Sequence, residues 1–111
     1  MVLKPEGGFI QTWLQHRDAD WPTNDTAYTF GPFRDRGFEW GVVKHADGTV
    51  DVSVSGPFNQ TFNVSGIESI PPSPGAEKPG KRVNLMLEWK EGVLRVRLNM
   101  VAVGTRTLAT A

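Results

Sequence analysis

The segment from Val83 to Val103 limits the possible folds more than any other part of the chain, because it predicts a β-hairpin with a self-consistent register. If Glu91-Gly92 forms a two-residue turn, four apolar pairs align on one face: Trp89 with Leu94, Leu87 with Val96, Leu85 with Leu98 and Val83 with Met100. On the other face Glu88 lies opposite Arg95. Such cross-strand pairs contribute ~0.2–1 kcal/mol each. A shift of the register by one residue would expose the apolar side chains to solvent. The segment therefore predicts an antiparallel sheet with one buried face.

A second hairpin is predicted from residue 38 to residue 55. Ala46-Asp47-Gly48 fits a three-residue loop in which Gly48 takes the left-handed conformation. Val42 then faces Val52, and Trp40 faces Val54. Apolar and polar residues alternate along 50–55, which is typical of a strand with one solvated face.

The remaining segments give weaker signals. Residues 9–16 fit either a short helix or an edge strand, because Phe9 and Trp13 share a face at both spacings. Gly31-Pro32 interrupts a β-prone stretch over 27–33 and predicts an edge strand or a bulge. Gly56-Pro57 marks a corner at which the chain is expected to pass from one sheet to the other. The final strand is expected to continue past Gly104 to Leu108.

Taken together, these segments predict about seven strands separated by turn signals. This pattern is typical of an all-β fold, an antiparallel β-sandwich of jelly-roll or Ig-like type. At 111 residues the chain is expected to form a single domain over 1–111. That domain would carry an extended lead over residues 1–8, possible helical structure just after it, and a Pro-rich loop over 69–81.

Composition excludes several classes of function. Twelve Lys and Arg balance twelve Asp and Glu with no long run of either sign, which argues against nucleic acid as the main partner. No apolar run reaches the ~18 residues of a membrane span, and the first residues lack the apolar core of a signal peptide. With no cysteine, the chain has neither a disulfide framework nor a thiolate metal site.

No catalytic set is recognisable in the sequence, so we expect a protein that is not an enzyme and uses no cofactor. His16 and His45 are the only histidines, and no serine stands in a nucleophile elbow. Asp18 and Asp20 lie two residues apart in a polar loop, but a calcium site needs six to eight oxygen ligands. We therefore expect no metal.

The candidate contact residues are aromatic, basic or proline side chains. Trp40 and Trp89 are in phase with core positions, which leaves Trp13 and Trp21 as the expected surface tryptophans. Exposed tryptophan is typical both of sugar platforms and of protein interfaces, where arginine is also enriched. The candidates for contact with a partner or a glycan are Trp13, Trp21, Tyr28, Arg95, Arg97, Pro71, Pro72 and Pro74.

Two resemblances give these features a possible context. The run from Asn84 to Asn99, followed by Val103-Gly104, resembles the paired strands of laminin-G and lectin-like jelly rolls. In overall character the chain is similar to small β-sandwich proteins of tailed-phage virions, which serve as minor tail, connector or head-decoration subunits. That resemblance implies a structural protein, assembled in the host cytoplasm into a virion, that docks to other subunits in a symmetric assembly through its loop, termini and strand edges. The alternative is a carbohydrate-binding module that uses Trp13, Trp21 and Tyr28.

Overall fold

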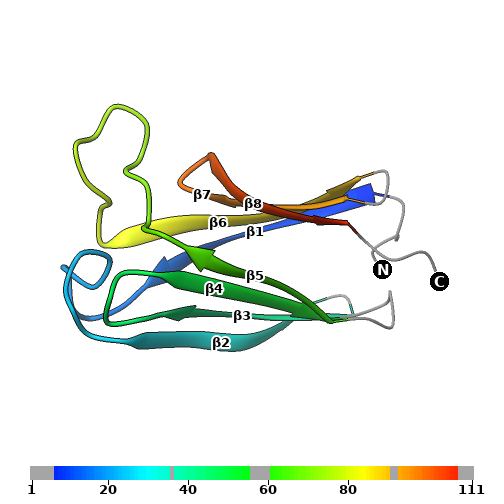
Figure 1. The fold of residues 1–111 in the computed structure, drawn as a ribbon, viewed down its shortest axis with the longest axis horizontal. Helices are drawn as coiled ribbons and strands as arrows, with labels where there is room; N and C mark the ends of the chain where they lie inside the picture. Colours follow the sequence, from blue (N-terminus) through cyan, green and yellow to red (C-terminus); the bar gives the residue numbers. More distant parts are fainter. Residues whose placement is uncertain (1–6, 36, 56–60, 91–92, 108–111) are drawn as a thin grey trace.

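Two antiparallel four-stranded sheets, packed face to face, make up the computed structural model of the chain (Figure 1). The structure describes residues 7–35, 37–55, 61–90 and 93–107, which form eight strands and no helix. Sheet A contains β1 (Gly7–Gln15), β6 (Arg82–Lys90), β7 (Val93–Leu98) and β8 (Val101–Thr107). Sheet B contains β2 (Tyr28–Asp35), β3 (Phe38–Lys44), β4 (Val50–Ser55) and β5 (Thr61–Ile67). The predicted all-β sandwich is confirmed.

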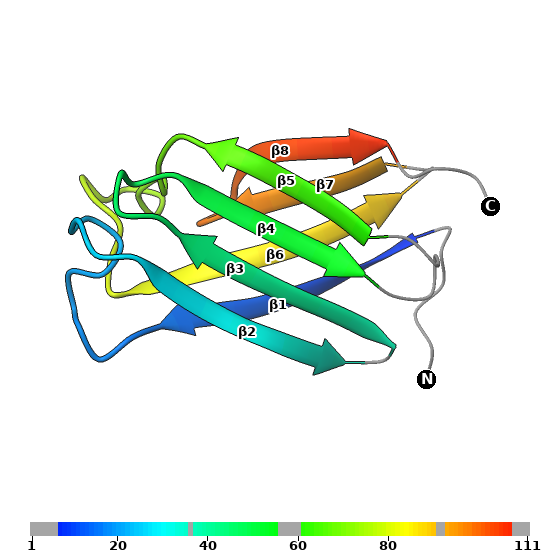
Figure 2. The same cartoon turned by 60° about the horizontal axis from the view of Figure 1, so that its bottom comes forward.

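The strand order is β1-β6-β7-β8 in sheet A and β2-β3-β4-β5 in sheet B. Each sheet is thus built from strands that follow one another in sequence, except that β6 returns from sheet B to lie beside β1. An Ig sheet instead interleaves distant strands in the order A-B-E-D. The expected jelly-roll or Ig-like type is therefore not confirmed. Figure 2 shows β1 and β2 at the same margin of the sandwich, one in each sheet.

The C-terminal hairpin has the predicted register along most of its length. Leu85, Leu87 and Trp89 pair with Leu98, Val96 and Leu94, and Glu88 lies opposite Arg95. The Glu91-Gly92 turn lies outside the described residues. The predicted pair between Val83 and Met100 is wrong, because β7 ends at Leu98 and its pairing with β6 ends at Leu85 and Leu98. Asn99 and Met100 form a turn with positive φ, and this turn divides the expected final strand into β7 and β8.

The hairpin over 38–55 is also confirmed, with Val42 opposite Val52 and Trp40 opposite Val54. Gly48 adopts φ 91°, as its turn requires. The expected change of sheet near Gly56-Pro57 is wrong, since β4 and β5 are neighbours in sheet B. Gly56-Pro57 itself lies outside the described residues. The chain instead returns to sheet A through the long loop between β5 and β6.

Residues 9–16 belong mainly to β1, so the alternative of a helix is wrong. Nine consecutive residues of β1 pair with β6, and these backbone hydrogen bonds decide between two spacings that the sequence left open. In β2, the register shifts between Phe30 and Phe33, where Gly31-Pro32 forms a cis peptide bond. The prediction was an edge strand or a bulge, and β2 has both features.

The core lies between the sheets and is filled by inward residues of β1 to β7, whereas β8 contributes only the half-buried Val103. The largest apolar side chains that are fully buried are Trp21, Trp89, Phe38, Leu14, Leu85, Leu87, Leu94 and Leu98. Phe38 of sheet B and Trp89 of sheet A stack with ring centroids 4.6 Å apart, which ties the two layers together. The outer face of each sheet is left for contact with solvent or a partner.

Candidate functional site

The outer face of sheet A brings together most of the candidate contact residues. Trp13 projects from β1 with 58% of its surface exposed, and Arg95 and Arg97 lie on the same face of β7. The loop over 68–81 stands beyond the plane of this sheet and contributes Pro74 (Figure 1). Four of the candidates, far apart in sequence, therefore share one surface.

A shallow hollow of about 180 Å³ lies beside the Trp13 indole. Its lining combines the amide side chains of Gln11, Asn84 and Asn99 with the apolar surfaces of Trp13, Pro74 and Met100, and with Ser73. The Arg82 guanidinium lies 5.4 Å from the Trp13 ring centroid, which is a cation–π distance. The exposed ring offers a flat apolar contact. Of the amides beside it, Asn84 and Asn99 are buried, and Gln11 Nε2 donates to Asn84 Oδ1 at 3.1 Å.

Asn99 fixes the loop to this surface. Its side-chain amide nitrogen donates to the carbonyl oxygen of Pro71 at 2.8 Å, and its side-chain oxygen accepts from the backbone nitrogen of Asn84 at 2.9 Å. Ile70 at the base of the loop is buried in the core. Pro71 is half-buried by this anchoring, whereas Pro72 and Pro74 are exposed. The loop therefore presents its prolines from a fixed base.

The charged part of the face consists of Glu88, Arg95 and Arg97. The Glu88 carboxylate lies 3.3 Å from the Arg95 guanidinium and 3.9 Å from that of Arg97. These groups are partly exposed, so their attraction is screened by solvent and stabilises the fold little. Both arginines remain partly accessible on this face.

Trp21 is not on the surface, and the prediction that it is exposed is wrong. The side chain is completely buried, its indole nitrogen donates to the carbonyl oxygen of Lys81 at 2.5 Å, and its ring lies 4.7 Å from that of Phe30. The loop that carries Trp21 folds over the end of the sandwich, and the indole fills the core at that end. Trp21 is therefore a core residue here rather than a contact residue.

Tyr28 takes part in a polar cluster at the same end of the sandwich. Its hydroxyl donates to Asp18 Oδ2 at 2.7 Å, and Asn24 Nδ2 donates to the same oxygen. Lys44, which is completely buried, donates from Nζ to the carbonyl oxygens of Asn24 and Thr26. The hydrogen bonds from Tyr28, from the backbone of residue 20 and from Asn24 lower the pKa of Asp18. The Lys44 ammonium thus fixes the 18–26 loop from the side of the core. The Asp18 carboxylate already accepts hydrogen bonds from protein donors.

The two histidines lie in separate local arrangements. His16 Nδ1 accepts from the backbone nitrogen of Asp18 at 3.1 Å. His45 Nε2 lies 2.7 Å from Asp51 Oδ2, and this contact, followed by a hydrogen bond from the Gly66 backbone, lowers the pKa of Asp51. Within the described ranges, neither histidine is hydrogen-bonded to a serine or threonine hydroxyl. Nor do three or more His, Cys, Asp or Glu residues of those ranges gather where they could hold a metal ion.

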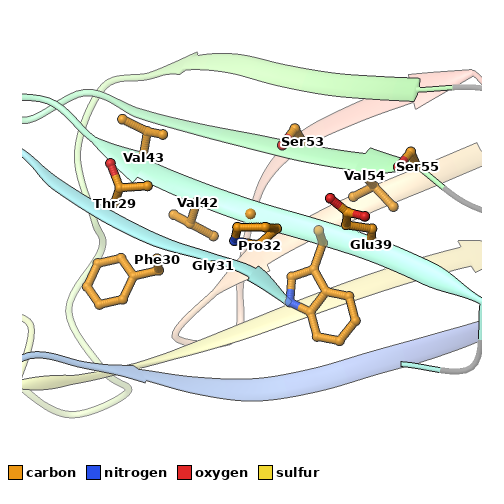
Figure 3. A pocket seen from close by; sticks show the side chains of 12 residues that line it. Thr29, Phe30, Gly31, Pro32, Glu39, Val42, Val43, Ser53, Val54 and Ser55 are labelled. Carbon is orange, nitrogen blue, oxygen red and sulfur yellow. The ribbon is translucent and has the colours of Figure 1, made fainter. Parts of the chain in front are cut away.

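A second hollow, of about 230 Å³, lies on the outer face of sheet B (Figure 3). It forms where Gly41 has no side chain and where β2 bulges at Gly31-Pro32; Glu39, Ser53 and Ser55 line its polar side. Glu39 is engaged by Arg34 at 3.1 Å. The one carboxylate among the described lining residues is therefore already paired. The buried indole nitrogen of Trp40 has no hydrogen-bond partner among the residues that the structure describes, but Trp40 belongs to the inward face of β3.

Sequence reasoning missed the amide residues and one aromatic residue of the sheet A face. Phe9 is as exposed as Trp13, and Gln11 lies between them. Period-two spacing of Phe9, Gln11 and Trp13 was the available signal, but it required residues 9–16 to be assigned as a strand. Nothing in the sequence places Asn99 beside Pro71, because 28 positions separate them.

Comparison with known proteins assigns neither a family nor a function. No protein-family model matches the chain, and neither the curated proteins nor the solved structures include a significant match. Among the described residues there is no helix with the length and apolar character needed to cross a membrane.

Proposed function

We propose that this protein is a non-catalytic assembly subunit that docks to neighbouring protein subunits through the outer face of sheet A, the adjoining Pro-rich loop and the edge of β1. The observation that carries this proposal is the pair of exposed aromatic side chains, Phe9 and Trp13, on an edge strand beside that loop. Exposed aromatic side chains on the same face as arginines are typical of a protein interface. A role among the small β-sandwich subunits of phage virions is the context that we propose for it.

The exposed aromatic side chains of this face, rather than its charge, carry the proposal. The face has four basic side chains, Arg82, Lys90, Arg95 and Arg97, beside the carboxylate of Glu88, although the whole chain has a formal net charge of zero. Covering Phe9 and Trp13 removes apolar surface from water, which favours association.

Glycan binding is the second candidate, and one observation favours it. The Trp13 indole stands beside the side-chain amides of Gln11 and Asn84 in the hollow by the loop. An aromatic ring can stack on the apolar face of a sugar while amides bond its hydroxyls. This site requires a free Trp13, whereas the assembly proposal requires that Trp13 become covered.

One pair of measurements separates the two functions. The mass of the chain in solution is followed by sedimentation as its concentration rises, and hydrogen exchange is compared between the dilute and concentrated samples. Assembly predicts a rising mass with slower exchange over 9–13 and at Ser73, the one residue of 71–74 that has a backbone amide hydrogen. Tryptophan emission is then followed during titration with a panel of glycans. A saturable emission shift from a monomer, lost in Trp13→Ala and retained in Arg95→Ala, would overturn the assembly proposal in favour of glycan binding.

A further inference from the structure

The edge of β1 differs from the other sheet edges that the structure describes. Exposed edges are normally protected from pairing by charge, proline, bulges or short length. β2 has Pro32 and a shift in register, β5 has a shift in register, and β8 has Arg106 and a shift in register. β1 runs for nine residues in unbroken register with β6 and contains neither a charged residue nor a proline.

Three outward residues of β1 form a nearly symmetric aromatic–amide–aromatic pattern. Phe9 and Trp13 lie two positions before and after Gln11, and all three project from the outer face of sheet A. Each aromatic side chain has 58% of its surface exposed. An antiparallel partner strand with the same sequence, centred on Gln11, would place its Trp13 opposite Phe9 and its Phe9 opposite Trp13.

We propose that the partner at this edge is a second copy of the chain, bound by antiparallel pairing of β1 with β1 about a two-fold axis at Gln11. The proposal deepens the assembly function argued above and rests on it. The pairing would join two copies of sheet A into one eight-stranded sheet. It would supply main-chain hydrogen bonds along the strands and two aromatic pairs on the outer face.

Charge also favours an identical partner. Across the two-fold axis Gln11 meets its own copy, and every other residue of β1 meets the residue equally far on the other side of Gln11. A charge at or beside the axis would therefore lie close to its own copy and destabilise the contact. The uncharged sequence of β1 meets this condition throughout its length. Aromatic pairs in tilted or edge-to-face geometry stabilise the contact beyond the area they bury.

The test uses two opposite charges at the proposed axis. Gln11→Lys and Gln11→Glu are made in the full chain, because Gln11 is exposed and its replacement leaves the core intact. In either variant alone, two like charges meet at the axis, and we expect the dissociation constant of the dimer to rise about tenfold or more. In an equimolar mixture Lys faces Glu, so a heterodimer forms. Native mass spectrometry resolves the heterodimer, and sedimentation gives its affinity.

Thr105→Lys is the matched control, since Thr105 is exposed on the same face but lies on β8, away from β1. Circular dichroism confirms that each variant is folded. A dimer of the unmodified chain and of Thr105→Lys, loss in both Gln11 variants and recovery in their mixture would support the proposal. Association that both Gln11 variants retain would overturn it and leave the assembly function intact on another surface. A chain that stays monomeric would overturn it as well, and the glycan titration then decides the function.

Discussion

Lys44 occupies an inward position of β3, in phase with Phe38, Trp40 and Val42, where alternation alone predicts an apolar side chain. A buried ammonium is costly unless it is fully hydrogen-bonded. The carbonyl oxygens of Asn24 and Thr26 supply that bonding, together with Asn24 Oδ1 at 3.3 Å. Lys44 therefore provides less apolar packing at the end of the core, but its hydrogen bonds fix the position of the 18–26 loop.

Replacing Lys44 tests that role. Lys44→Met retains much of the side-chain length but leaves two loop carbonyls without their donor, so we expect the free energy of unfolding to fall by about 2–4 kcal/mol. Urea denaturation at neutral pH measures the change. Lys90→Met, at an exposed position, should stay within about 0.5 kcal/mol of the unmodified chain. Equal urea midpoints for the two variants would contradict the structural role of the ammonium.

Met100 has a strained backbone conformation. The two-residue turn of Asn99 and Met100 has φ values of 49° and 71°, a left-handed region that costs an ordinary L-residue ~1–2 kcal/mol. Glycine is the preferred second residue of such a turn. We expect Met100→Gly to raise the free energy of unfolding by about 0.5–1 kcal/mol in urea titrations. Asn99→Gly should have the opposite effect, because it removes the hydrogen bonds to Pro71 and Asn84.

Asp51 makes the free energy of unfolding depend on pH. Its pKa in the folded chain is lowered from the ordinary value of 3.8, by His45 first and by the Gly66 backbone second. A lowered pKa favours the folded state fully above 3.8, and that contribution is lost as the pH falls through the lower folded value. Asp51→Asn should therefore be less stable near neutral pH by at most about 1 kcal/mol, because the pair is partly exposed. The difference in urea midpoint should vanish in acid; a constant difference would contradict this.

Some residue environments were not predictable because they depend on contacts between distant segments. Trp21 lies in a polar loop, and its burial is decided by the carbonyl of Lys81, 60 positions away. Trp40 and Trp89 were placed correctly, since each lies in a strand whose alternation identifies its inward face. For the candidate site, the sequence supplied Trp13 and the arginines but not the amides that surround the indole.

At the scale of elements, a hairpin was predictable where both of its strands carried alternation. The registers over 38–55 and 85–98 followed from matching two apolar faces across one turn. β1 was left open because its outward face bears Phe9 and Trp13, so apolar residues occur on both faces of the strand. The break between β7 and β8 was missed because Asn99-Met100 lacks the glycine that usually marks such a turn.

The contact between β8 and β5 depends on Gly104. A Cβ atom added there would lie 2.2 Å from Val64 Cγ1, and Val64 is buried and stiff about χ1. We expect Gly104→Ala to lower the free energy of unfolding by about 1–3 kcal/mol in urea. Gly7→Ala is the control, because its nearest neighbour would be 3.7 Å away. In a Val64→Ala background the cost of Gly104→Ala should shrink; an unchanged cost would place its cause elsewhere.

At the scale of the molecule, the sandwich was predictable but the path between its sheets was not. Alternation shows that each strand has one buried face, and two such sheets must cover each other. It does not say which strands share a sheet. The Gly-Pro corner was a reasonable place for a change of layer, yet β4 and β5 remain paired, and the 68–81 loop makes the return that places β6 beside β1.

Because one core serves both sheets, the molecule should unfold as a unit. Leu87 lies at the middle of β6, fully buried, and Leu87→Ala should lower the free energy of unfolding by about 2–5 kcal/mol. The sheets share the Phe38–Trp89 stack, so near-ultraviolet dichroism of the buried tryptophans and far-ultraviolet dichroism of the strands should shift together. Both signals are followed in one urea titration at a fixed protein concentration, since association would stabilise the folded state. Loss of the tryptophan signal before the strand signal would mean that the two layers separate before either unfolds.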